Sequence, residues 1–127
     1  MSTTPDLRGL HLLLVEDEYL LALGLADAAS DLGAEVFGPV GSVQDALALV
    51  QKLPELDAAI LDINLGDATI YPVADALRAR GVPFFFSTAS APIELPERFR
   101  DVPVCRKPFD VAAFRAALGR LYPARAA

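Results

Sequence analysis

The chain has 127 residues, and its 54% hydrophobic and 22% charged residues are typical of a single globular domain rather than of a disordered segment. Its 11 Lys and Arg stand against 17 Asp and Glu, and this net charge of −6 argues against a nucleic-acid-binding surface, which needs a basic stripe. A single cysteine excludes an internal disulfide and suits a reducing cytoplasm, and no apolar run approaches the length of a membrane span.

Strands are expected to alternate with helices along most of the chain. We interpret residues 9–122 as one domain, preceded by a flexible leader (1–8) and followed by a C-terminal tail (123–127). The expected strands cover residues 10–15, 35–40, 57–62, 82–87 and 102–105, and the expected helices cover 18–32, 43–52, 70–80 and 111–121.

Capping residues and prolines set the expected limits of the helices. Ser42 and Asp110 are the expected N-caps of the second and the last helix. Pro92 and Pro96 lack backbone donors, so any fourth helix within residues 90–101 is expected to be short or irregular. Apolar residues at helical spacing define the expected inner faces: Leu20, Leu21, Leu25, Ala28, Ala29 and Leu32 in the first helix, and Val111, Phe114, Leu118 and Leu121 in the last.

The alternation predicts an α/β fold, a flavodoxin-like doubly wound (βα)5 domain with a parallel five-stranded sheet. Two mostly apolar runs, 12–15 and 57–62, lack the alternation of a half-exposed strand and are typical of strands covered by helices on both faces. With right-handed crossovers the expected strand order is 2-1-3-4-5. The chain then reverses direction between the first and third strands, and ligands of such sheets bind in the crevice at that point.

Residues suited to phosphoryl chemistry follow the carboxyl ends of four expected strands. They are Glu16 and Asp17, then Asp62, Thr88 and Lys107. Three carboxylates that converge in one crevice repel one another, and a hard divalent cation satisfies them, usually Mg²⁺ where phosphate also binds. A lysine ammonium and a threonine hydroxyl can hold phosphoryl oxygens. The set therefore suits transfer of a phosphoryl group onto an aspartate.

Four motifs in this order resemble those of the receiver domains of bacterial two-component response regulators, and the resemblance covers residues 10 to about 121. The motifs are Val15-Glu16-Asp17-Glu18, Leu61-Asp62-Ile63-Asn64-Leu65, Ser87-Thr88-Ala89 and Lys107-Pro108-Phe109. The resemblance implies that Asp62 is the phosphoacceptor, that Glu16, Asp17, Asp62 and the backbone carbonyl of Asn64 hold Mg²⁺, and that Thr88 and Lys107 contact the phosphoryl group. It also implies a cis peptide bond between Lys107 and Pro108.

The sequence departs from the usual receiver pattern at three places. Val104 stands where receivers usually carry a switch aromatic, Gly66 stands where a proline is usual, and prolines interrupt the fourth helix. Together with Phe86-Ser87-Thr88 and Tyr71-Pro72-Val73-Ala74, these features resemble the single-domain Phe-x-Thr regulators of alphaproteobacteria that pair with HWE-type histidine kinases.

The resemblance implies a stand-alone response regulator in the cytoplasm. It would accept a phosphoryl group from a histidine kinase or phosphotransfer protein and signal by contact with a downstream protein, with no nucleic acid or membrane partner. Its own phosphorylation and dephosphorylation would be its only catalysis. Three alternatives remain: a degenerate receiver that only docks, a Mg²⁺-dependent phosphohydrolase of the haloacid dehalogenase type, and a flavodoxin-like mononucleotide binder.

Other notable residues are expected to have structural roles rather than functional ones. Cys105 is expected to fill apolar space in the fifth strand, and His11 to be an ordinary histidine at a strand start. The run 84–86, three phenylalanines, is expected to pack in the core. The segment 89–104 is the expected output surface, because Val104 offers no large ring to rotate and a proline-interrupted segment opens locally at low cost.

Overall fold

The computed structural model describes residues 6–66, 68–89, 94–108 and 110–121. A five-stranded sheet lies at its centre in the order β2-β1-β3-β6-β7, and every neighbouring pair is parallel. The strands are β1 (His11–Val15), β2 (Glu35–Val40), β3 (Ala58–Asp62), β6 (Phe84–Thr88) and β7 (Val104–Arg106). The helices are α1 (Tyr19–Asp31), α2 (Val43–Lys52), α3 (Tyr71–Ala79) and α4 (Val111–Leu121). The flavodoxin-like order predicted from the sequence is confirmed.

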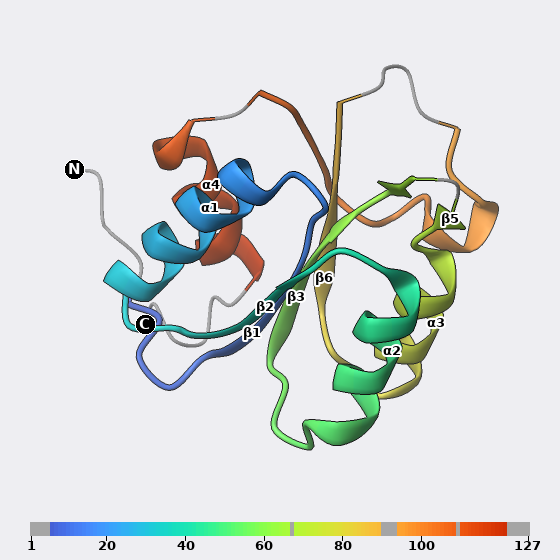
Figure 1. The fold of residues 1–127 in the computed structure, drawn as a ribbon, viewed down its shortest axis with the longest axis horizontal. Helices are drawn as coiled ribbons and strands as arrows, with labels where there is room; N and C mark the ends of the chain where they lie inside the picture. The colour runs from blue at the N-terminus through green and yellow to red at the C-terminus, as the bar shows by residue number, and fades with distance from the viewer. Residues whose placement is uncertain (1–5, 67, 90–93, 109, 122–127) are drawn as a thin grey trace.

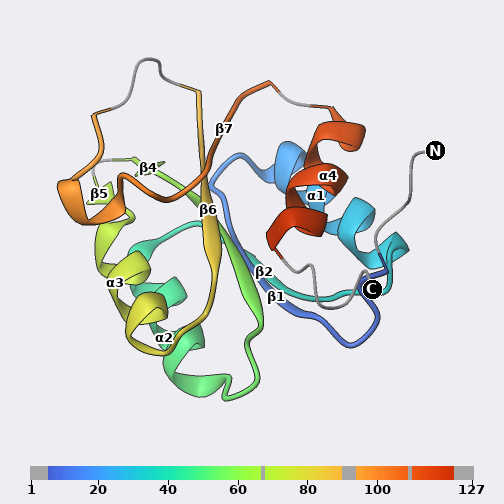
Figure 2. The same cartoon turned by 180° about the vertical axis from the view of Figure 1, so that it is seen from behind.

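Helices cover both faces of the sheet. Helices α1 and α4 lie together on one face, and α2 and α3 lie on the other (Figures 1 and 2). Successive strand residues point to opposite faces, so Leu12 and Leu14 belong to the core under α1 and α4, while Leu13 and Val15 belong to the core under α2 and α3. None of the helices in the described part of the chain is long and apolar enough to span a membrane.

Two strands begin two residues later than the sequence pattern predicts, and hydrogen bonding explains the delay. The N–H of Val82 donates to Leu77 O at 3.0 Å, which closes the end of α3. The N–H of Val102 donates to Phe99 O at 3.0 Å in the same way. Pro83 and Pro103, which follow, have no N–H and join the ladder only through their carbonyls. The apolar runs alone did not reveal that the backbone N–H of the first residue of each predicted strand, Val82 or Val102, is hydrogen-bonded in the preceding turn.

The loop predicted around Gly66 contains a small antiparallel hairpin of β4 (Asn64–Leu65) and β5 (Ala68–Thr69). Gly66 has φ +63°, a conformation that favours glycine in a tight turn. Such two-residue strands carry too little pattern to be predicted from sequence.

The predicted helix caps are present. The hydroxyl of Ser42 accepts the N–H of Asp45 at 3.1 Å, and Asp110 Oδ1 accepts the N–H of Ala113 at 2.7 Å. The predicted inner faces are partly wrong, because Leu20 is 85% exposed and Val111 is 48% exposed. Both lie in the first turns of their helices, beyond the stretch that packs on the sheet.

Part of the segment predicted as a leader is packed. Leu7 is buried, and its N–H donates to Leu32 O at 2.9 Å. The packed chain therefore extends at least two residues before the predicted domain boundary at residue 9. Residues 1–5 and the predicted tail 123–127 lie outside the described residues.

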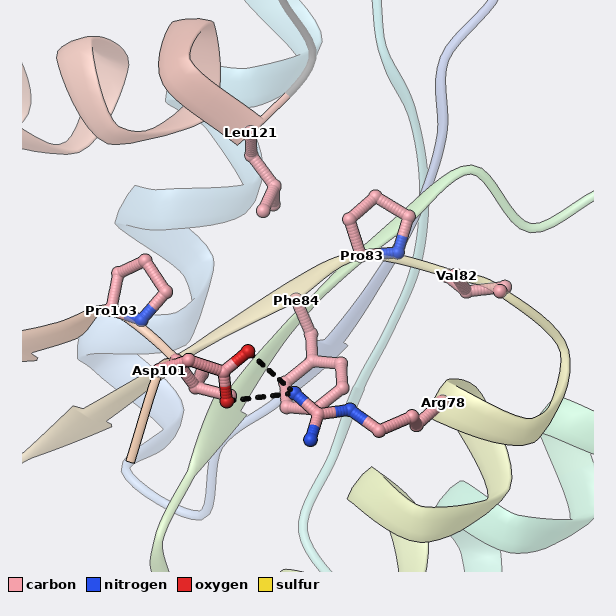
Figure 3. Close-up of a pocket in the computed structure, with 9 residues that line it drawn as sticks. Arg78, Val82, Pro83, Phe84, Asp101, Pro103 and Leu121 are labelled. Atoms are coloured by element: carbon pink, nitrogen blue, oxygen red, sulfur yellow. Dashed lines mark hydrogen bonds and ion pairs between the residues drawn. The ribbon is translucent and has the colours of Figure 1, made fainter. Parts of the chain in front are cut away.

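Between β6 and β7, where the sequence predicted only a short or irregular helix because of its prolines, the described residues form a short 3-10 turn, η1 (Glu97–Phe99). Two arginines join this segment to α3. Arg78 donates to the carbonyl of Arg98. Its guanidinium also donates to Asp101 Oδ1 at 3.3 Å, as Figure 3 shows, and Arg98 pairs with Asp75 at 2.8 Å. The Arg98 guanidinium also lies 4.5 Å from the centre of the Phe99 ring.

Candidate functional site

The candidate site lies at the carboxyl ends of β1, β3 and β7. Glu16 directly follows β1, Asp62 is the last residue of β3, and Lys107 directly follows β7. A bulge fixes Glu16, because β1 and β2 change register between Leu13 and Val15, and the Glu16 N–H donates to Val40 O at 2.9 Å. The bulge requires Gly38, which has φ +115° and whose Cβ would lie 2.4 Å from Leu14 O.

Lys107 joins the two buried carboxylates. Its ammonium Nζ lies 2.8 Å from Glu16 Oε2 and 3.1 Å from Asp62 Oδ2. All three side chains are more than nine-tenths buried. Since a buried charge is costly unless it is paired, the three groups hold one another in place.

Burial and neighbouring charges shift the pKa values of Glu16 and Lys107. Burial, followed by the neighbouring Asp62 carboxyl, raises the pKa of Glu16 to about 7, against the opposing contacts of Lys107 and the Glu18 N–H. Burial lowers the pKa of Lys107, but its contacts with Glu16 and Asp62 outweigh burial and leave that pKa raised. The ammonium therefore stays charged near neutrality, while Glu16 gains or loses a proton there.

The acidic residues fit a divalent cation. Glu16, Asp17 and Asp62 each offer one carboxylate oxygen, and these oxygens all lie within 4.8 Å of one another. Glu16 Oε2 is buried and accepts no hydrogen bond from the described residues, although Lys107 lies beside it. Asp17, by contrast, is exposed and gives the site an open side. A hard oxygen-ligand ion that keeps some of its waters suits this combination.

The remaining predicted site residues lie around this centre. Thr88 ends β6, is buried, and its carbonyl accepts the N–H of Lys107 at 2.7 Å, which ties the two strand ends together. Asn64 is exposed in β4, and its N–H donates to Asp62 Oδ1 at 3.3 Å. The peptide bond between Lys107 and Pro108 is cis, as predicted. The structure thus brings all six predicted residues to one edge of the sheet.

The phenylalanine run and Cys105, for which the sequence predicts packing roles, have those roles in the structure. Phe84, Phe85 and Phe86 are all buried in the core. Cys105 is half-buried against the core under α1 and α4, and burial raises the pKa of its thiol, which makes it a poor nucleophile. Val104, at the usual place of the switch aromatic, is 37% exposed in β7.

One cavity in the described part of the chain lies away from this site and offers no free charged group for phosphoryl chemistry. A cavity of about 330 Å³ lies at the opposite edge, among residues before β6 and β7 and at the end of α4 (Figure 3). It offers Arg78 and Asp101, but these pair with each other.

The fold and the acidic edge together define a class: a doubly wound α/β domain with its polar site at the topological switch point. The sequence matches no family model and no curated protein. Solved structures do match. SdrG from Sphingomonas melonis Fr1 is 43% identical over 88% of this chain and 95% of its own, with a TM-score of 0.77. The BeF3-activated conformation of SdrG from Pseudomonas melonis Fr1 is 44% identical over 87% of this chain and 94% of its own, with a TM-score of 0.72.

Two further similar structures are a response regulator and a response regulator receiver domain protein. A response regulator receiver domain protein from Bacillus halodurans C-125 is 26% identical over 87% of this chain and 95% of its own, with a TM-score of 0.70. The response regulator PhyR from Brucella abortus is 28% identical over 87% of this chain and 46% of its own, with a TM-score of 0.72. The chain belongs to the receiver domains of response regulators.

Proposed function

We propose that the protein is a stand-alone receiver that accepts a phosphoryl group on Asp62 and signals by protein contact. One observation carries the proposal: Lys107 Nζ lies 3.1 Å from Asp62 Oδ2 at the acidic edge, where Glu16 and Asp17 converge with Asp62. Similarity to the receiver domains, one of them in a BeF3-activated conformation, supports the same role.

In the proposed reaction a carboxylate oxygen of Asp62 attacks the phosphorus of a phosphohistidine donor. The new O–P bond forms as the P–N bond breaks, and the bonding electron pair leaves with the histidine nitrogen. The Lys107 ammonium, already beside Asp62, then contacts a phosphoryl oxygen. The hydroxyl of Thr88, at the end of the neighbouring strand, donates to another.

Glu16, Asp17, Asp62 and the backbone carbonyl of Asn64 would hold Mg²⁺ in this proposal. The bound ion would neutralise negative charge on the phosphoryl oxygens. Glu16 has a second task, because it keeps Lys107 aligned toward Asp62 through its 2.8 Å contact with the ammonium. Asp17 is exposed and leaves the phosphoryl donor access to the site.

The proposed partners are a histidine kinase or phosphotransfer protein as donor and a downstream protein as target, in the cytoplasm. Pairing with an HWE-type kinase follows from the narrower resemblance around Phe86-Ser87-Thr88. The only chemistry proposed for the protein itself is its own phosphorylation and the hydrolysis of its aspartyl phosphate.

The protein is incubated with acetyl phosphate and Mg²⁺ and then run in a phosphate-binding gel, which separates the phosphorylated protein from the unphosphorylated one and so tests the proposal. The wild type should shift, Asp62→Asn should not, and omission of Mg²⁺ should abolish the shift. Asp27→Asn, an exposed acid of α1 remote from the site, is the matched control and should shift normally. A wild type that never shifts would indicate a degenerate docking receiver, and steady hydrolysis of a simple phosphate monoester would indicate a phosphohydrolase.

A further inference from the structure

Ser87 carries a buried hydroxyl at the end of β6, one residue before Thr88. The residue is 1% exposed, and its Oγ makes no hydrogen bond to any of the residues that the structure describes. A hydroxyl buried without a hydrogen bond costs free energy, and such groups are rare in folded proteins. The steps of the proposed phosphotransfer do not use this hydroxyl. Its neighbours in the sheet indicate what it can bind.

Ser87 lies beside the phosphoacceptor on the same face of the sheet. It pairs with Asp62 of β3 on one side and with Cys105 of β7 on the other. Two residues before Ser87 and Asp62, Phe85 and Ile60 belong to the core under α1 and α4. Because side chains alternate between the two faces along a strand, Ser87 and Asp62 point to that same face. Adjacent strands are about 4.8 Å apart, so the two side chains are neighbours.

The side chain of Lys107 crosses β6 on this face. Lys107 follows β7, and its ammonium lies 3.1 Å from Asp62 on β3 and 2.8 Å from Glu16, which follows β1. Strand β6 lies between β7 and β3, so the lysine side chain must span the end of β6 to reach these carboxylates. Ser87 is the β6 residue that pairs with Asp62 on the same face. The Ser87 hydroxyl therefore lies on the path of the lysine side chain.

The two carboxylates that hold Lys107 in the free protein are also needed elsewhere. Glu16 Oε1 and Asp62 Oδ2 accept hydrogen bonds from the ammonium at 3.0 and 3.1 Å. Both residues also belong to the acidic group that fits a divalent cation. An ammonium has three donors and no acceptor, so a donor released by these carboxylates needs a new acceptor. A serine hydroxyl offers two lone pairs for this purpose.

We propose that Ser87 is a positioning residue for phosphotransfer: its hydroxyl accepts a hydrogen bond from Lys107 when Asp62 carries the phosphoryl group. This contact would hold the ammonium against a phosphoryl oxygen, and Ser87 itself would not touch the phosphoryl group. The inference rests on the proposed function, since it concerns the phosphorylated state of Asp62. In the free protein the carboxylates still hold Lys107, which explains why Ser87 has no partner among the described residues.

NMR of the lysine side-chain nitrogens in the full chain reports the proposed contact directly. The sequence contains only two lysines, and the exposed Lys52 serves as the internal reference for Lys107. Spectra are compared for the wild type and Ser87→Ala, without metal and then with Mg²⁺ and beryllofluoride, which takes the place of the phosphoryl group. The substitution should shift the Lys107 signal much more in the beryllofluoride-bound protein than in the free protein. Equal shifts in the two states would overturn the proposal.

The affinity for beryllofluoride measures how much the contact contributes. Ser87→Ala should weaken binding about tenfold, which corresponds to the loss of one hydrogen bond to a charged group. Ser87→Thr keeps the hydroxyl and should bind more tightly than Ser87→Ala. Ser30→Ala, at an exposed serine of α1, is the matched control and should bind as the wild type does.

Thermal unfolding of the metal-free proteins separates positioning from a merely structural role. The midpoint of Ser87→Ala should not fall below that of the wild type, because the hydroxyl has no partner among the described residues in this state. A lower midpoint together with wild-type affinity for beryllofluoride would show that Ser87 only stabilises the fold. A wild type that binds no beryllofluoride would refute the proposed function itself, whereas tight and equal binding by the wild type and Ser87→Ala would overturn this inference alone.

Discussion

Glu16→Gln should change how the stability of the protein depends on pH. Glu16 is buried beside Asp62, and its pKa is raised to about 7 from an ordinary value of 4.5. Glutamine keeps the shape and the acceptor oxygen for the Glu18 N–H, which lies 3.1 Å from Glu16 Oε1. It removes the titrating carboxyl and, with it, the negative partner of the Lys107 ammonium.

The direction follows from proton binding. Between about pH 4.5 and 7 the folded protein keeps a proton on Glu16 that the unfolded chain has released, so the free energy of unfolding falls as the pH rises through this window. The fall should reach about 3 kcal/mol, because one pKa unit corresponds to about 1.4 kcal/mol. Above the window the contribution is constant. Glu16→Gln should lack this fall. The substitution also removes an ion-pair partner of Lys107. Comparing the pH slopes of the two proteins, rather than their stabilities at one pH, separates that loss from the titration.

Urea unfolding followed by circular dichroism at pH 5 and pH 8, with a chelator present, measures the effect. Every other titrating group is common to both proteins, so the difference between the two pH slopes reports Glu16 together with its contacts to Asp62 and Lys107. Glu18→Gln, an exposed acid two residues along, is the matched control and should keep the wild-type slope. If Glu16→Gln lost stability between these pH values as steeply as the wild type, the assignment of a raised pKa to Glu16 would be refuted.

Two further predictions concern the metal and the output segment. Asp17→Asn relieves carboxylate repulsion and should raise the stability of the metal-free protein by about 0.5–1 kcal/mol. It should also remove the stabilisation that Mg²⁺ gives the wild type, about 1.4 kcal/mol in the free energy of unfolding at ten times the dissociation constant. A variant whose thermal midpoint still rose with Mg²⁺ by the wild-type increment would contradict this. Beryllofluoride on Asp62 should produce its largest change in amide exchange, outside the site loops, within residues 89–104. A change centred on α1 with 89–104 unaffected would place the output surface elsewhere.

The sheet could be predicted from the sequence because the strands carry strong local signals. The apolar run before Glu16 and the run before Asp62 lack alternation, and the caps at Ser42 and Asp110 mark helix starts. Strand starts were less accurate at Val82 and Val102, because a residue that closes a preceding turn looks like a strand residue. The periodicity likewise did not show where a helix leaves the sheet, so Leu20 was wrongly placed inside.

The sequence predicts that the candidate site residues converge, but it does not predict how they are arranged within the site. The order of strands brings Glu16, Asp17 and Asp62 to one edge, and topology alone predicts this. The difference between a buried Glu16 and an exposed Asp17 depends on the bulge at Gly38, which is a tertiary feature.

Reductive trapping of the phosphorylated protein tests the central claim most directly. Borohydride reduces an aspartyl phosphate to the alcohol, homoserine, and so marks the residue that carried the phosphoryl group. Peptide mass mapping after phosphorylation and reduction should find homoserine at position 62 and at no other aspartate. Homoserine at another position, or a phosphorylated protein with Asp62 unchanged, would contradict the account.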